Sequence, residues 1–149
     1  ISAFCRCCAR PAPSARNTTM KIELGTVGHF GLAVPDPQRS AAWWTSLFDL
    51  ETLFEGDEYV GLTNANVTIV LVKGDPHPAT IDHVSFHLPN VTALRAALER
   101  LERHGVEVED PGDEIGPEAK GSPHLGLWFH DPDGYRWELS VLNGARESL

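Results

Sequence analysis

The spacing of hydrophobic and polar residues divides the chain into two halves with the same order of elements. In the first half, residues 26–34 read as a strand, and apolar residues at helical spacing then continue to Leu50. Asp36 followed by Pro37 is typical of a helix N-cap and its first residue. Three short strands are expected after this helix, over residues 51–54, 58–62 and 67–73.

The second half repeats this order. A strand over residues 81–88 precedes Asn90, which is a typical N-cap, and an apolar stripe at helical spacing follows until Gly105 ends the helix. Further strands are expected over residues 106–108, 125–130 and 135–142, with a Gly/Pro-rich loop over 110–123. Asp131-Pro132-Asp133-Gly134 predicts a tight turn between the last two strands.

The repeated unit is therefore β-α-β-β-β, and the fold class is α+β. One such half buries too little surface to be stable alone, so we expect the two modules, over about residues 24–74 and 80–143, to pack together. The predicted architecture is a curved cup of mixed sheet with the helices outside. A ligand pocket is expected on the concave face of this cup.

Residues 1–19 differ from the rest and are interpreted as a disordered or non-native extension to a single domain over residues 20–149. The segment contains no acidic residue, and it lacks the apolar stretch of a secretory signal. A transit peptide and a start site assigned upstream of Met20 remain alternatives. Cys5, Cys7 and Cys8 all lie here, without a matching zinc-finger cluster, so we expect no structural metal in this segment.

Composition narrows the function. The chain has 149 residues and is 42% hydrophobic and 22% charged, as expected for an ordinary globular protein. A net charge of −9 argues against nucleic acid as a partner, and no apolar run is long enough to span a membrane. Residues 9–149 carry no cysteine, which suits a reducing compartment, and a cytoplasmic location is expected.

Three polar residues stand at conspicuous positions in the predicted strands. His29 and His83 open the first strand of each half, and each is followed by Pro after six residues and by Asp or Asn after seven. Glu138 lies between Trp137 and Leu139 in the last strand, so it faces away from these two apolar neighbours. If the repeat is symmetric in space, the two imidazoles and the carboxylate meet in the cavity.

Two imidazoles and one carboxylate suit a divalent ion such as Zn, Fe, Mn, Ni or Co. A buried carboxylate also needs a metal or another partner. We therefore predict one metal ion held by His29, His83 and Glu138, with positions left open for a substrate. The alternative is that Glu138 pairs with Arg136, two residues away on the same strand face.

Two further histidines are candidates for moving protons. His87 lies four residues after His83, on the same strand face, and His124 lies beside the long loop. With Glu138 they form the predicted catalytic set. The alternative for His87 is a residue at the rim of the cavity.

These segments resemble the glyoxalase / bleomycin resistance / extradiol dioxygenase family, the vicinal oxygen chelate superfamily. The resemblance covers about residues 21–143. It is carried by the segments 28–34, 43–50, 82–87 and 129–138. It implies paired βαβββ modules and a divalent metal that chelates neighbouring oxygens of a small substrate, with His29, His83 and Glu138 as ligands by position.

The chain also departs from known members of that family. The last strand of the first half, residues 67–72, lacks the second glutamate of glyoxalase I. Trp128 stands where extradiol dioxygenases have a tyrosine, and no cation-binding loop of a fosfomycin enzyme is recognisable.

The resemblance implies a metal-dependent lyase, isomerase or dioxygenase acting on a small oxygen-rich molecule. The alternative is a non-catalytic, drug-binding resistance protein of the same fold. A homodimer is expected, and the sequence leaves open whether the three ligands come from one chain or from two.

Overall fold

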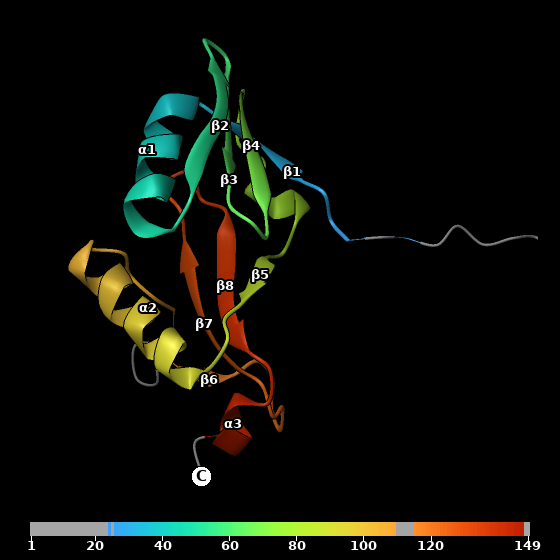
Figure 1. Ribbon diagram of the computed structural model, residues 1–149, viewed down its shortest axis with the longest axis vertical. Coiled ribbons are helices and arrows are strands. Elements are labelled where there is room, and N and C mark those ends of the chain that lie inside the picture. The colour runs from blue at the N-terminus through green and yellow to red at the C-terminus, as the bar shows by residue number, and fades with distance from the viewer. Residues whose placement is uncertain (1–23, 25, 110–114, 148–149) are drawn as a thin grey trace, which may run out of the picture.

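Two four-stranded sheets follow one another along the long axis of the molecule, with the two long helices on one side (Figure 1). The computed structural model describes residues 24, 26–109 and 115–147. The predicted extension over residues 1–19 lies outside the described residues.

The two halves have the same topology. The first sheet has the order β1-β4-β3-β2 and consists of β1 (Phe30–Val34), β2 (Glu51–Gly56), β3 (Tyr59–Thr63) and β4 (Thr68–Lys73). The second has the order β5-β8-β7-β6 and consists of β5 (Val84–His87), β6 (Gly116–Pro117), β7 (Leu125–His130) and β8 (Arg136–Val141). In each sheet the first strand is parallel to the last, and the other pairs are antiparallel. The predicted α+β class is confirmed.

Each sheet has its own helix between its first two strands. These are α1 (Pro37–Leu47) and α2 (Val91–Arg103), while the 3₁₀ turn η1 (Pro78–Thr80) and the short helix α3 (Gly144–Glu147) lie outside the repeat. The predicted caps are confirmed, because Asp36 accepts a hydrogen bond from the Arg39 N–H at 3.0 Å and Asn90 accepts one from Ala93 at 2.9 Å. Gly105 follows α2 at φ 68°, a conformation that favours glycine.

Several predicted boundaries are wrong. The first strand begins at Phe30 and not at residue 26, because its partner β4 begins only at Thr68. Helix α1 ends at Leu47, three residues early, and β5 begins at Val84, three residues late. The strand expected over residues 106–108 is reduced to a single bridge between Val108 and Phe129. The strand that pairs with β7 at the edge of the sheet is instead the short β6, which lies inside the predicted loop.

One continuous core joins the two halves. Trp44 of α1 and Trp137 of β8 are both buried and meet edge to face, with ring centroids 4.7 Å apart. Arg100 of α2 donates hydrogen bonds to the carbonyls of Leu47 and Ser46, at the C-terminus of α1, where a cation is favourable. The Tyr135 hydroxyl donates to the Ala33 carbonyl at 2.8 Å. These contacts join the two halves to each other.

Strand alternation gives each sheet one covered and one open face. In β8, the covered face carries Trp137 and Leu139, and the open face carries Glu138. In β4, Ile69 and Leu71 are completely buried, and Val70 lies between them on the open face. No described helix is long and apolar enough to cross a membrane.

Candidate metal centre

The open face of the second sheet carries a cavity of about 590 Å³. Its lining includes Glu138 of β8, Trp128 of β7 and His83, which directly precedes β5. The other lining residues are Asp82, Ser85, His87, Glu118, Ala119 and Arg136. The predicted orientation of Glu138 is correct, because its neighbours Trp137 and Leu139 pack in the core.

Glu138 is buried, with 3% of its surface exposed, and its Oε1 atom has no hydrogen-bond partner. The carboxylate lies over Gly126 of β7, where an added Cβ would be 2.6 Å from Oε1. Glycine at this position therefore makes room for the carboxylate. A buried carboxylate oxygen without a partner is costly unless a bound group, such as a cation, offsets the loss of its hydration.

His83 lies beside Glu138 in an orientation fixed by Asp82. Its Nδ1 atom is 2.7 Å from Oδ2 of Asp82, and because a carboxylate only accepts, Nδ1 carries the proton. This hydrogen bond is the main cause that lowers the pKa of Asp82 below its ordinary value. In the neutral imidazole, Nε2 then presents a lone pair toward the cavity.

The Nε2 atom of His83 is 3.5 Å from Oε2 of Glu138. Two acceptors facing each other at this distance need a proton or a cation between them. Two ligands bonded at about 2.1 Å to a tetrahedral metal ion lie about 3.4 Å apart. The spacing and the chemistry of this pair therefore fit a shared divalent ion.

Arg136 does not neutralise Glu138 through any contact that the described residues show. Its guanidinium forms two hydrogen bonds with Glu109, at 2.8 and 2.7 Å, and lies 3.4 Å from Asp82. The hydrogen bonds with Glu109 raise the pKa of Arg136 and lower that of Glu109. No hydrogen bond or ion pair joins Glu138 to Arg136 among the described residues, although the charge of Glu138 adds, as a smaller cause, to the raised pKa of Arg136.

The two histidines predicted to move protons differ in their surroundings. His87 lines the cavity, and its Nδ1 is 2.8 Å from the hydroxyl of the buried Ser140, which is 2.9 Å from Ser85. His124 accepts a hydrogen bond at Nδ1 from the Asn143 N–H, 2.8 Å away, and is not among the described residues that line this cavity.

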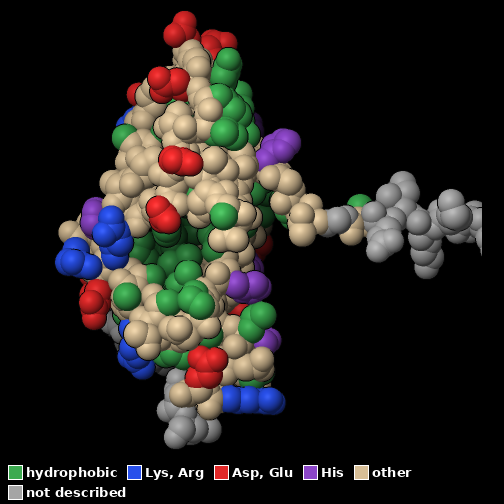
Figure 2. Space-filling model, in the orientation of Figure 1, with side chains coloured by type: hydrophobic (Ala, Val, Ile, Leu, Met, Phe, Trp, Pro, Cys, Tyr) green, Lys and Arg blue, Asp and Glu red, His purple; other side chains and the backbone are tan. Residues whose placement is uncertain are grey.

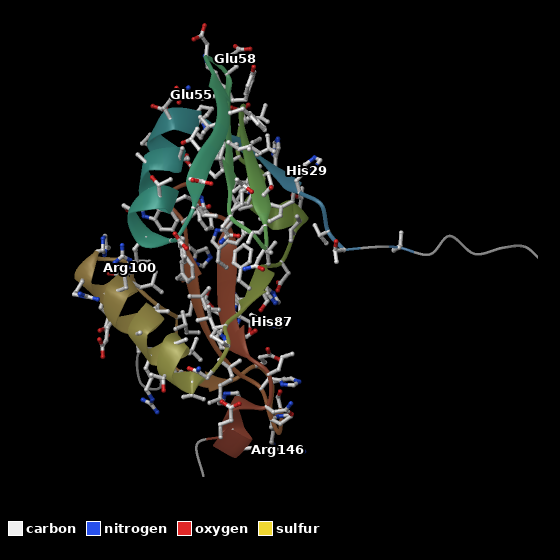
Figure 3. The ribbon with its side chains drawn as sticks, viewed as in Figure 1. His29, Glu55, Glu58, His87, Arg100 and Arg146 are labelled. Carbon is white, nitrogen blue, oxygen red and sulfur yellow. The ribbon has the colours of Figure 1, made fainter. Side chains whose placement is uncertain are left out.

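His29 lies just before β1, in the other half of the molecule (Figure 3). It is exposed, and the structure does not bring it to the cavity that His83 lines. Among the residues described, no three His, Cys, Asp or Glu side chains gather into a group able to hold a metal ion. Within one chain, therefore, only two of the three predicted ligands meet.

The strand register explains why one sheet has a carboxylate and the other does not. Phe30 and Val84 follow His29 and His83, and they are in register with Ile69 and Trp137. The counterpart of Glu138 in the first sheet is therefore Val70. The first module offers a histidine without a carboxylate, and the second offers both.

A second cavity, of about 550 Å³, lies between the two halves. Figure 2 shows apolar side chains in the hollow at the centre of the molecule. Phe48, Ile69 and Leu139 contribute to its wall, and Ser85 and His87 line both this cavity and that of Glu138.

Sequence reasoning did not identify Gly126 or Asp82 as parts of the site. A glycine inside a strand often marks a close approach of another group, and that signal was available for Gly126. The role of Asp82 rests on the orientation of the His83 ring, which the sequence does not specify.

Comparison with known proteins decides the family. The sequence profile of the glyoxalase/bleomycin resistance protein/dioxygenase superfamily matches residues 26–139. The chain belongs to this superfamily. No curated protein matched the chain.

Solved structures of this superfamily share the fold. A glyoxylase/bleomycin resistance protein/dioxygenase domain from Frankia is 26% identical, with a TM-score of 0.64 over 80% of this chain and 98% of that one. The fosfomycin resistance protein FosX from Listeria monocytogenes, in complex with Mn(II) and sulfate, is 20% identical, with a TM-score of 0.66 over 85% and 100%. Lactoylglutathione lyase from Agrobacterium tumefaciens is 15% identical, with a TM-score of 0.65 over 80% and 96%.

Proposed function

We propose that the protein is a divalent-metal-dependent enzyme of this superfamily, a lyase, isomerase or dioxygenase that acts on a small oxygen-rich substrate. The observation that carries the proposal is the pair formed by His83 and Glu138. Two metal-ligating atoms face each other at 3.5 Å, and the other carboxylate oxygen is buried without a partner. Without a metal ion this arrangement only lowers the stability of the fold, because a buried carboxylate oxygen without a partner is costly.

The third ligand in this proposal is His29 of a second copy of the chain. His29 precedes β1 as His83 precedes β5, so the open faces of the two sheets present equivalent positions. The open face of the first sheet carries Val70 and the exposed side chains of Phe54, Tyr59 and Val72. A two-fold dimer covers this face with the second sheet of its partner and completes two identical sites.

The chain's own residues have distinct roles in this site. Asp82 fixes the tautomer of His83, so that Nε2 points toward Glu138, and such partners raise the basicity of a ligating imidazole. The ion, when bound, acts as a Lewis acid on a substrate oxygen. His87 is the residue we assign to proton transfer, because it lines the cavity and is hydrogen-bonded to Ser140. His124 keeps its Nδ1 engaged with the backbone of Asn143.

Metal analysis tests the proposal. Purified protein is incubated with Zn²⁺, Mn²⁺ or Fe²⁺ without oxygen, desalted, and measured by plasma mass spectrometry. We expect about one equivalent of metal per chain in the wild type and a loss of at least tenfold in affinity for His83→Ala and Glu138→Gln. His77→Ala, which removes an exposed histidine outside the cavity, is the control and should bind normally.

The identity of the preferred metal ion also distinguishes between the possible reactions. Zinc, nickel or cobalt as the preferred ion favours lyase or isomerase chemistry, and iron or manganese favours oxygen chemistry. An absence of metal in every preparation would contradict the proposal and favour the non-catalytic binding protein instead.

A further inference from the structure

The carboxylate that orients His83 is not held in place by burial. The side chain of Asp82 is 83% exposed, and the residue lies in the short segment between η1 and β5. An exposed carboxylate turns between rotamers and binds water, and ordering it costs conformational entropy. A second contact of this carboxylate therefore determines how firmly the imidazole is oriented.

Arg136, the first residue of β8, supplies a second contact. Its Nη1 atom is 3.4 Å from Oδ2 of Asp82, the same oxygen that lies 2.7 Å from Nδ1 of His83. The contact follows from the strand register, because β5 and β8 are parallel with Val84 paired to Trp137, so His83 and Arg136 stand next to each other at the start of these strands. One carboxylate oxygen thus joins the guanidinium to the imidazole.

The guanidinium is itself fixed from its other side. Its Nε and Nη2 atoms donate hydrogen bonds of 2.8 and 2.7 Å to the two carboxylate oxygens of Glu109, which is a bidentate and directional contact. The backbone N–H of Glu109 donates in turn to the carbonyl of Trp128 in β7, at 2.7 Å. Arg136 is therefore anchored to the sheet through the segment that follows α2, and its remaining nitrogen, Nη1, faces Asp82.

Two carboxylates compete for the single N–H of the neutral imidazole. Asp82 lies beside Nδ1, and Oε2 of Glu138 lies 3.5 Å from Nε2. Both tautomers of the ring are uncharged, so the choice between them depends on which carboxylate is better placed to accept. A mobile Asp82 would let the proton move to Nε2, toward Glu138, and would remove the lone pair from that nitrogen.

We propose that Arg136 is a positioning residue for His83, which acts through Asp82 and keeps the proton of the neutral imidazole on Nδ1. The anchor that Glu109 gives to Arg136 extends this control to the segment that follows α2. The preference between the tautomers belongs to the protein without metal. Its consequence, a lone pair on Nε2 ready to bind a metal ion, rests on the proposed function.

Nitrogen NMR measures the tautomer directly. Metal-free protein labelled with ¹⁵N in its histidines is recorded with a chelator, at a pH above which the imidazole shifts no longer change, and the signals of His83 are assigned by comparison with His83→Ala. We expect the wild type to carry the proton mostly on Nδ1. Arg136→Gln should lower the ratio of the Nδ1–H to the Nε2–H form by about twofold to fivefold, which is the range that an exposed ion pair contributes.

Three further variants separate positioning from a general loss of stability. Arg136→Lys keeps the charge but has no planar fork to contact Glu109 and Asp82 together, so it should restore only part of the ratio. Arg39→Gln removes an ion pair of the first module, with Asp133, and should leave the ratio unchanged. In an Asp82→Asn background, Arg136→Gln should change the ratio less than it does in the wild type, because Arg136 acts through that carboxylate.

Two results overturn the inference and leave the proposed metal site untouched. One is an unchanged ratio in Arg136→Gln, which would show that Asp82 orients His83 without help. The other is an equal change with and without Asp82→Asn, which would show that Arg136 does not act through Asp82. Zinc binding by the unlabelled wild type is measured separately, and protein that binds no zinc contradicts the proposed function without altering the tautomer result.

Discussion

At the scale of single residues, the site depends on two acceptor atoms that the fold holds together at a cost. Oε2 of Glu138 and Nε2 of His83 face each other. The hydrogen bond with Asp82 keeps the proton of the neutral imidazole on Nδ1, so only a doubly protonated His83 could donate from Nε2 to the carboxylate. Gly126 provides the space for this carboxylate. A cation relieves the arrangement, so metal affinity should be sensitive to small changes around Glu138.

The substitution Gly126→Ala tests this directly. The new methyl group would lie 2.6 Å from Oε1 of Glu138, so the buried carboxylate has to move away from His83. We expect metal affinity to fall at least tenfold. Calorimetric titration with Zn²⁺ is the measurement. Gly74→Ala, where the added atom makes an ordinary 3.5 Å contact with Ala33, is the control and should bind like the wild type. Unchanged affinity in Gly126→Ala would show that Glu138 is not a ligand.

At the scale of elements, the turn before β8 holds that strand in place. Asp131 is buried and accepts hydrogen bonds from the backbone of Asp133 and Tyr135 and from the Trp137 indole. Burial raises the pKa of Asp131 nonetheless. Asp133 reaches to the first half, where it binds the side chains of Arg39 and Ser40 of α1. The turn thus links the strand that carries Glu138 to the other module.

Asp133→Ala should therefore destabilise the whole domain. It leaves the hydroxyl of the buried Ser40 without its partner and removes the ion pair with Arg39, so we expect a loss of about 1–3 kcal/mol. Urea unfolding followed by circular dichroism measures it. Asp57→Ala, at the exposed tip of the β2–β3 hairpin, should change stability by less than about 0.5 kcal/mol. An equally small effect of Asp133→Ala would show that the contacts of Asp133 with α1 do not stabilise the domain.

The elements also show what the sequence can and cannot predict. Both helix N-caps and the strand β7 were predicted correctly, because Asp36, Asn90 and the Asp-Pro-Asp-Gly turn that follows residues 125–130 are local signals. The first strands of the two halves were predicted to begin too early, at residues 26 and 81, because the start of a strand depends on where its partner strand begins. The repeat correctly placed the two histidines at equivalent positions of the two modules. No local pattern in the sequence specifies how the open sheet faces of two chains would pack against each other.

At the scale of the whole molecule, stability depends on charged groups that link distant segments. The pair between Arg136 and Glu109 lowers the pKa of Glu109, so its ionised form stabilises the fold. This contribution is present above the ordinary pKa of glutamate and is lost as the pH falls through the lowered value. Asp131, whose pKa is raised, acts in the opposite direction, and its contribution falls as the pH rises.

Comparison with Glu109→Gln isolates this contribution. Between about pH 6 and pH 3, the metal-free wild type should lose more stability than the variant, because only the wild type has this carboxylate to protonate. Asp131 is present in both proteins and cancels in the difference. Thermal unfolding in the presence of a chelator, recorded across this range, provides the comparison. Parallel curves for the two proteins would show that the pair contributes nothing that depends on pH.

We propose that the metal site is shared between two copies of the chain, and mixing two variants of the chain distinguishes a shared site from one within a single chain. His29→Ala and Glu138→Gln chains are unfolded together in equal amounts, refolded, and analysed for bound zinc. Neither variant alone should retain zinc, but in the mixture half of the dimers combine one chain of each kind and contain one intact site. We therefore expect the mixture to contain about a quarter of the wild-type metal content. A mixture that binds no more zinc than the separate variants would contradict it.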